Sequence, residues 1–227
     1  MVQRNHILDN IPVHVTLDER LSSNKVLLNT YILLSSTLLF SALIAGVAIF
    51  TNARQLHWVL NLGGYFGLLF VVTKLRNSAW GLLAIFALTG FLGYTLGPIL
   101  TLYLGLPNGS QIVMLSLGST GSIFLALSAY VLVSRRDLRF MDGFLMVGIL
   151  VMFLIGIGTA LFNMPMVSMT VSGVFILLMS GMILWQTSAI IHGGETNYIM
   201  ATVNLYVTLF NLFVSLLQIL GIVASDD

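Results

Sequence analysis

Seven long apolar segments, with no charged side chain in their interiors, dominate this sequence. Each is about 20 residues or longer, the length that an α-helix needs to cross the hydrocarbon core of a bilayer. They are residues 25–50, 57–75, 79–104, 111–133, 142–162, 166–191 and 196–223. Only 7% of all residues are charged, whereas soluble domains contain roughly 25%. The sequence therefore predicts an all-α membrane protein with seven transmembrane helices.

The connections between these segments are short and polar, and several contain Gly, Pro or Asn. Connections this short make consecutive helices antiparallel neighbours, and they leave no room for an inserted soluble domain. The domain organisation expected is a tail at residues 1–23, a membrane domain at 24–223 and a short tail at 224–227. The first apolar segment is too long for the core of a cleavable signal peptide, so we expect it to remain as the first span.

The positively charged residues are distributed unevenly between the two sides of the predicted bundle. Only Arg54 falls on the side opposite the amino terminus. The other eight fall on the amino-terminal side: Arg4, Arg20, Lys25, Lys74, Arg76, Arg135, Arg136 and Arg139. Because loops rich in Lys and Arg stay in the cytoplasm, we expect a cytoplasmic amino terminus and, with seven spans, a carboxyl terminus outside.

The last apolar segment contains polar residues at helical spacing. They are Asn197, Asn204, Thr208, Asn211, Ser215 and Gln218, here called the polar stripe. At about 100° per residue they share one face of a helix, within an arc of roughly 80°. Lipid would leave their hydrogen-bonding groups unsatisfied, so this face must meet protein or water. Two interpretations stay open, namely hydrogen bonding to neighbouring helices and a polar path or sensor inside the bundle. Both place this helix in the middle.

The third segment contains glycines three and four residues apart, followed by a proline. Gly90, Gly93 and Gly97 form this set, and Pro98 follows directly. Glycines at this spacing let a neighbouring backbone approach closely, and Gly93 with Gly97 forms a GxxxG pair. Pro98 removes a backbone donor and is expected to kink the helix. Close packing is the favoured interpretation, and a hinge is the alternative.

Residues for catalysis or for holding a cofactor or metal do not form a recognisable pattern in this sequence. Cysteine is absent, and there is no HExxH, phosphate-loop or nucleophile-elbow motif. His192 and Glu195 are three residues apart with no third ligand nearby, which makes a poor metal site. The Lys and Arg residues form no basic patch for nucleic acid. We therefore expect a non-enzymatic membrane protein without a cofactor, whose surroundings are the lipid bilayer.

Several stretches resemble the YccA branch of the Bax inhibitor family. They are residues 89–98, 128–132, 190–199, 201–207 and 211–217, and residues 190–199 include the loop His192-Gly193-Gly194-Glu195. The resemblance extends from about residue 25 to the end. It implies seven helices with the last one central and wrapped by the other six. It also implies a bacterial inner-membrane location, and a role as partner, substrate and modulator of the FtsH protease, with prohibitin-like companions.

The chain departs from the family at one pair of positions. Calcium-leak members are expected to carry aspartates on the sixth and seventh helices, where this sequence has Gln186 and Thr208. An amide and a hydroxyl cannot share a proton as two carboxylates do, so a pH-gated calcium leak is doubtful. Modulation of FtsH is the leading hypothesis, with residues 1–23 as an unstructured handle for the protease. The alternative is a calcium or proton leak with a degenerate di-aspartyl sensor, and a small-molecule carrier is the least favoured class.

Overall fold

The computed structural model describes residues 13–162 and 164–225. Within them lie seven α-helices, one 3₁₀ turn (Arg139–Met141) and no strand. The helices are α1 (Val13–Phe50), α2 (Trp58–Leu75), α3 (Trp80–Leu104), α4 (Gly109–Ser134), α5 (Asp142–Phe162), α6 (Pro165–Ile191) and α7 (Tyr198–Ser225). All seven include a stretch that is long and apolar enough to cross a membrane. The predicted seven-helix membrane protein is confirmed.

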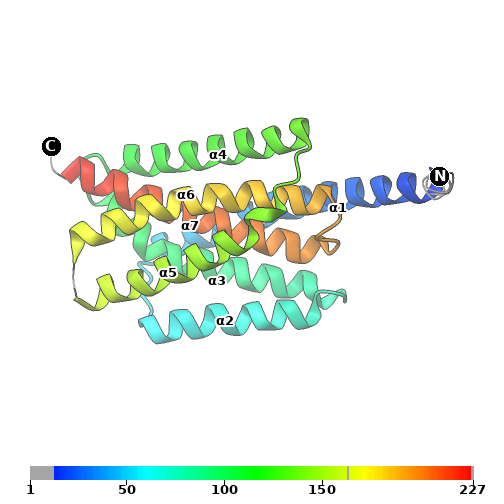
Figure 1. Ribbon diagram of the computed structural model, residues 1–227. Coiled ribbons are helices and arrows are strands. Elements are labelled where there is room, and N and C mark those ends of the chain that lie inside the picture. Colours follow the sequence, from blue (N-terminus) through cyan, green and yellow to red (C-terminus); the bar gives the residue numbers. More distant parts are fainter. Residues whose placement is uncertain (1–12, 163, 226–227) are drawn as a thin grey trace.

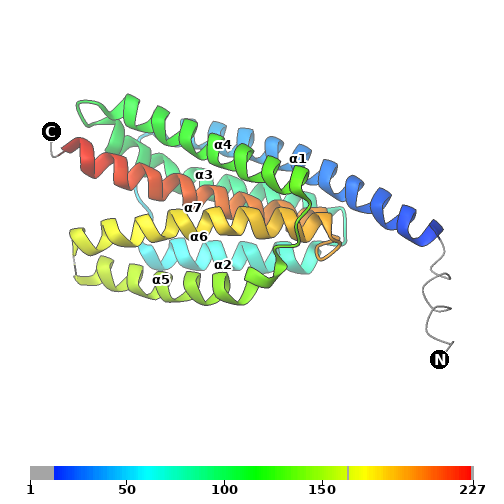
Figure 2. The same ribbon diagram turned by 45° about the horizontal axis from the view of Figure 1, so that its top comes forward.

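The helices form an elongated bundle in which the start of α1 and the end of α7 lie at opposite ends (Figure 1 and Figure 2). We call these ends the amino end, where α1 starts, and the carboxyl end, where α7 stops. Helix α7 packs against α1, α3, α4 and α6, while α2 packs against α3 and α5 against α6. The last helix therefore packs against four of the other six helices, whereas α2 and α5 pack mainly against α3 and α6. A last helix wrapped by all six stays a prediction.

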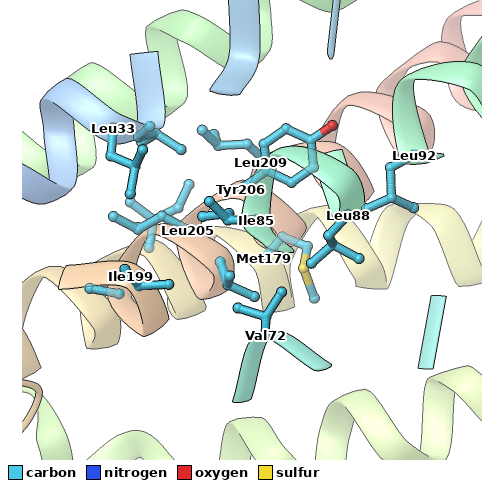
Figure 3. Packing of buried hydrophobic residues seen from close by; sticks show 14 of the residues in the cluster. Leu33, Val72, Ile85, Leu88, Leu92, Met179, Ile199, Leu205, Tyr206 and Leu209 are labelled. Atoms are coloured by element: carbon cyan, nitrogen blue, oxygen red, sulfur yellow. The ribbon is translucent and has the colours of Figure 1, made fainter. Parts of the chain in front are cut away.

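The core gathers around the first half of α7 (Figure 3). Tyr206 is 1% exposed and is the largest of the fully buried side chains. It lies among apolar residues of four other helices: Leu33, Val72, Ile85, Leu88, Leu92 and Met179. The Tyr206 hydroxyl is within 2.5 Å of Ser41 Oγ and donates to the carbonyl oxygen of Thr89 at 3.3 Å. These bonds satisfy the polar tip, so a tyrosine can be buried at membrane depth.

Helix α1 starts earlier than the sequence suggests. The expected tail ended at residue 23, but the backbone is already helical from Val13, and residues 1–12 lie outside the described part of the chain. Helix α1 has 38 residues, or about 57 Å, which exceeds the roughly 30 Å of a bilayer core. It therefore projects beyond the other helices (Figure 2). Residues 13–23 contain no Gly or Pro to stop the helix, so the part of the expected unstructured handle that the structure describes is helical, and residues 1–12 lie outside the described residues.

The glycines of α3 lie against α1. A Cβ atom added at Gly93 would collide with the Ser41 carbonyl oxygen, and one added at Gly97 would collide with Ala48. At Gly90 it would come within 2.9 Å of the Phe40 ring. Helix α3 continues through Pro98 to Leu104. The structure thus places the glycines where two helices approach closely, as the packing interpretation requires.

Candidate functional site

The polar stripe of α7 meets three different surroundings along its length. Asn197, at the amino end, reaches the connection between α2 and α3. Asn204 lines a small cavity, and Thr208 contacts α6. The last three residues, Asn211, Ser215 and Gln218, line a larger cavity toward the carboxyl end. The stripe is therefore neither uniformly packed nor one continuous channel.

Gln186 and Thr208 face one another across the interface of α6 and α7. Gln186 Nε2 donates a hydrogen bond to Thr208 Oγ1 at 3.0 Å, and both side chains are buried. The Thr208 hydroxyl in turn donates to the carbonyl oxygen of Asn204 at 2.8 Å. Gln186 Oε1 has no hydrogen-bond partner among the described residues. The structure thus brings Gln186 and Thr208, the two positions where aspartates are expected in calcium-leak relatives, together through a neutral hydrogen bond.

A cavity of about 180 Å³ lies on the amino-end side of this pair. Trp185, Gln186 and Asn204 form part of its wall, and the Trp185 Nε1 donor has no partner in the described structure. Three charged residues, Arg139, Asp142 and Glu195, complete its polar lining. Since a water molecule takes about 30 Å³ in the liquid, several waters fit here. The cavity brings polar surroundings close to Gln186.

The larger cavity has a volume of about 600 Å³ and lies between α5, α6 and α7. On its wall, Gln218 Oε1 accepts a hydrogen bond from Ser172 Oγ at 2.7 Å, and Gln218 Nε2 donates to Ser168 Oγ at 2.5 Å. Asn204 lines the small cavity and Asn211 the large one, and these residues are about 10 Å apart along α7. The turn of helix that separates the two cavities contains Thr208.

The loop between α6 and α7 ties several helix ends together. Gly193 has φ 71°, a backbone conformation that favours glycine, and it reverses the chain after α6. Glu195 Oε1 then accepts from the Asn197 backbone N–H at 2.8 Å. Asn197 Oδ1 caps the start of α7 by accepting from the backbone N–H groups of Ile199 and Met200. In the α2–α3 connection, Asn197 Nδ2 donates to the Arg76 carbonyl oxygen at 3.0 Å and to Asn77 Oδ1 at 2.8 Å. This loop is a structural junction.

Ser188 and His192 extend the junction to the connection between α4 and α5. Ser188 Oγ donates to the Arg136 carbonyl oxygen at 3.2 Å and accepts from the Leu138 N–H at 2.9 Å. His192 Nε2 lies 3.2 Å from the Arg135 carbonyl oxygen. Neither Ser188 nor Trp185 belongs to a motif or to the polar stripe, so the sequence offered no signal for either residue.

Asp137 and Arg139 form an exposed ion pair in this same connection. Arg139 Nη2 donates to Asp137 Oδ2 at 2.8 Å. This hydrogen-bonded guanidinium holds the pKa of the Asp137 carboxyl well below its usual range. The carboxylate therefore stays charged across the physiological pH range, and its titration does not provide a switch.

Comparison with known proteins agrees with the resemblance. A family model described as "Inhibitor of apoptosis-promoting Bax1" matches residues 23–225. An uncharacterized protein of Pseudomonas aeruginosa is 51% identical over 202 residues, which are 89% of this chain and 91% of that protein. The "Modulator of FtsH protease YccA" of Escherichia coli is 49% identical over 206 residues, or 91% of this chain and 94% of that protein. The chain is therefore a multi-pass membrane protein of the Bax inhibitor-1/YccA family.

Proposed function

We propose that this protein resides in the inner membrane, binds the FtsH protease and restrains its action on membrane proteins. The observation that carries the proposal is the 49% identity, over 91% of the chain, to a protein named as the modulator of that protease. A second relative, equally similar, is named as an inner membrane protein. This chain and the FtsH modulator match over nearly their full lengths. The proposed function therefore rests on similarity of the whole bundle and not of one shared motif.

The site geometry favours a binding protein over an enzyme. The groups that meet in the core are amides and hydroxyls, of which Gln186 with Thr208 is the central pair. Such groups form hydrogen bonds but do not take up or release protons near neutral pH, so they provide no general acid or base. Helix α1 projects from the amino end. We propose that this projecting part of α1 contacts FtsH. Prohibitin-like companions of the protease are further proposed partners.

We propose that the amino end faces the cytoplasm, because most of the positive charges lie on that side, and this orientation has a direct test. A reporter that is active only in the cytoplasm is expected to work when fused after Arg136 and to fail when fused after Asp227. The measurement is the reporter activity of the two fusions, compared at equal expression levels. The opposite pattern would place the start of α1 on the outer side and would contradict the proposed orientation.

Affinity purification from native membranes tests the partnership itself. The tagged full chain, solubilised in mild detergent, is expected to retain FtsH, while an unrelated tagged multi-pass protein serves as the control. Raising the level of the chain should also lengthen the half-life of an unassembled membrane protein that FtsH degrades. Absence of FtsH from the purified material, together with an unchanged substrate half-life, would refute the proposal.

A cation leak is the second candidate function, and one specific observation favours it. Two cavities with polar side chains in their walls lie along the same face of α7, on either side of Thr208. Rearrangement of the Gln186–Thr208 hydrogen bond would be needed to join them. Calcium flux into vesicles containing the purified protein is the measurement. We expect none from the natural sequence, because the pair carries no charge to replace the hydration of a cation.

A further inference from the structure

The large cavity combines a ligand-sized volume with a polar but uncharged wall. Its volume of about 600 Å³ falls within the range of small-molecule sites, roughly 300–1,000 Å³. Val171, Phe175 and Val214 form apolar parts of the wall. The polar part is formed by Thr159, Ser168, Ser172, Asn211, Ser215 and Gln218. None of the described residues that line it carries a charge.

Ser215 is a buried residue whose hydroxyl has no hydrogen-bond partner among the described residues. The residue is only 8% exposed and lines the cavity, yet it forms no hydrogen bond with any described residue. Serines and threonines in these helices usually donate to the carbonyl one turn earlier, as Ser116 does to Ile112 at 2.8 Å and Thr202 does to Tyr198 at 2.7 Å. Ser215 departs from that pattern, so its hydroxyl is available to a molecule in the cavity.

Asn211 supplies a second available group one turn away. Its Nδ2 donates to the carbonyl oxygen of Val207 at 2.8 Å, and its Oδ1 has no partner in the described structure. The amide oxygen accepts hydrogen bonds, and the Ser215 hydroxyl both donates and accepts. Because i and i+4 positions share a helix face, one ligand group can reach both. The complementary group is a hydroxyl or a primary amide.

We infer that this cavity is a binding site for an uncharged molecule that carries hydroxyl or amide groups. A charged group would be buried there without a partner of opposite sign, which is strongly unfavourable. An apolar molecule would leave Ser215 and Asn211 unsatisfied. A soluble polyol and the glycerol headgroup of an uncharged lipid share the required chemistry. The inference does not depend on the partnership with FtsH.

Cysteine labelling tests whether the cavity is open to water. The natural chain contains no cysteine, so a single introduced thiol reports its own position. In purified full-length protein, Ser215→Cys is expected to react with a water-soluble maleimide about tenfold or more faster than Ser116→Cys, because a fully buried thiol reacts only after local opening. Ser116 is a matched control, since it is buried on α4 and lies outside both cavities. If both variants fold and Ser215→Cys reacts as slowly as Ser116→Cys, the inference is overturned.

Ligand-induced thermal stabilisation tests the chemistry of the site. Myo-inositol represents a soluble polyol, monooleoylglycerol represents an uncharged lipid, and phosphocholine is the charged control. At least one uncharged probe is expected to raise Tm, since a ligand that binds only the folded state stabilises it. The probe that does so identifies the source of the ligand. If phosphocholine acts equally well, or if no probe raises Tm, the inference fails.

Variants at Ser215 make the test specific to the cavity. Ser215→Ala removes a hydroxyl without breaking any bond within the described protein, so Tm without ligand is expected to stay unchanged. The affinity for the uncharged probe is expected to fall about five- to tenfold, the effect of one hydrogen bond. Ser116→Ala, the matched control, should leave the affinity unchanged. An affinity of Ser215→Ala equal to that of the natural protein would show that the probe binds elsewhere.

Discussion

Replacing Gly93 by leucine is expected to prevent the bundle from assembling. The first added carbon would already collide with the Ser41 carbonyl oxygen and come within 2.8 Å of Ser41 Oγ. Backbone atoms of α1 cannot turn aside as a flexible side chain does, so α1 and α3 would have to separate. Overpacking a core costs about 1–3 kcal/mol where side chains can adjust, and the cost here should exceed that range. Separation of the two helices would also disturb the hydrogen bond between the Tyr206 hydroxyl and Ser41 Oγ.

Gly118 on α4 provides the matched control for this substitution. A Cβ atom added there meets nothing within 4 Å. Gly118→Leu is therefore expected to insert and fold normally, and it exchanges a poor helix former for a good one. Thermal unfolding and the level of protein in the membrane measure both variants. Normal folding of Gly93→Leu would show that α1 and α3 are not in close contact at this glycine.

Replacing both Gln186 and Thr208 by aspartate is expected to create dependence on pH and on calcium. The two side chains are within 3.0 Å, so two buried carboxylates there would hold one proton between them. Burial and the neighbouring carboxylate favour the protonated form in the folded protein, and unfolding then releases protons. The free energy of unfolding should therefore fall as the pH rises, by about 1.4 kcal/mol for each tenfold change in proton affinity.

Calcium should reverse this loss of stability, because a carboxylate pair supplies the oxygen ligands and the negative charge that the ion requires. Thermal unfolding as a function of pH and calcium, together with flux into vesicles, provides the measurements. The single variants Gln186→Asp and Thr208→Asp are the controls, and each should show a weaker calcium response. Vesicles that pass calcium with the natural protein, and stop passing it with Thr208→Val, would instead favour the leak as the native function.

Much of this architecture follows from hydropathy and spacing alone. Unbroken apolar length predicted seven spans, and the observed helices begin and end close to the predicted positions everywhere except at the start of α1. That boundary was missed because hydropathy reports where a helix leaves the membrane, whereas the helix itself continues to Val13. Helical spacing also identified the polar stripe and the glycine face of α3, since residues on one face are determined by the 3.6-residue period.

Which partner each face meets was decided only by the tertiary structure. Lipid and a neighbouring helix are both apolar, so hydropathy does not distinguish a face against α1 from a face against the bilayer. The opposition of Gly93 to Ser41 and the hydrogen bond of Ser172 to Gln218 join residues far apart in the sequence. The unused hydroxyl of Ser215 depends on the space left between three helices. Periodicity specifies the face of a helix, and the packing of seven helices specifies what lies opposite.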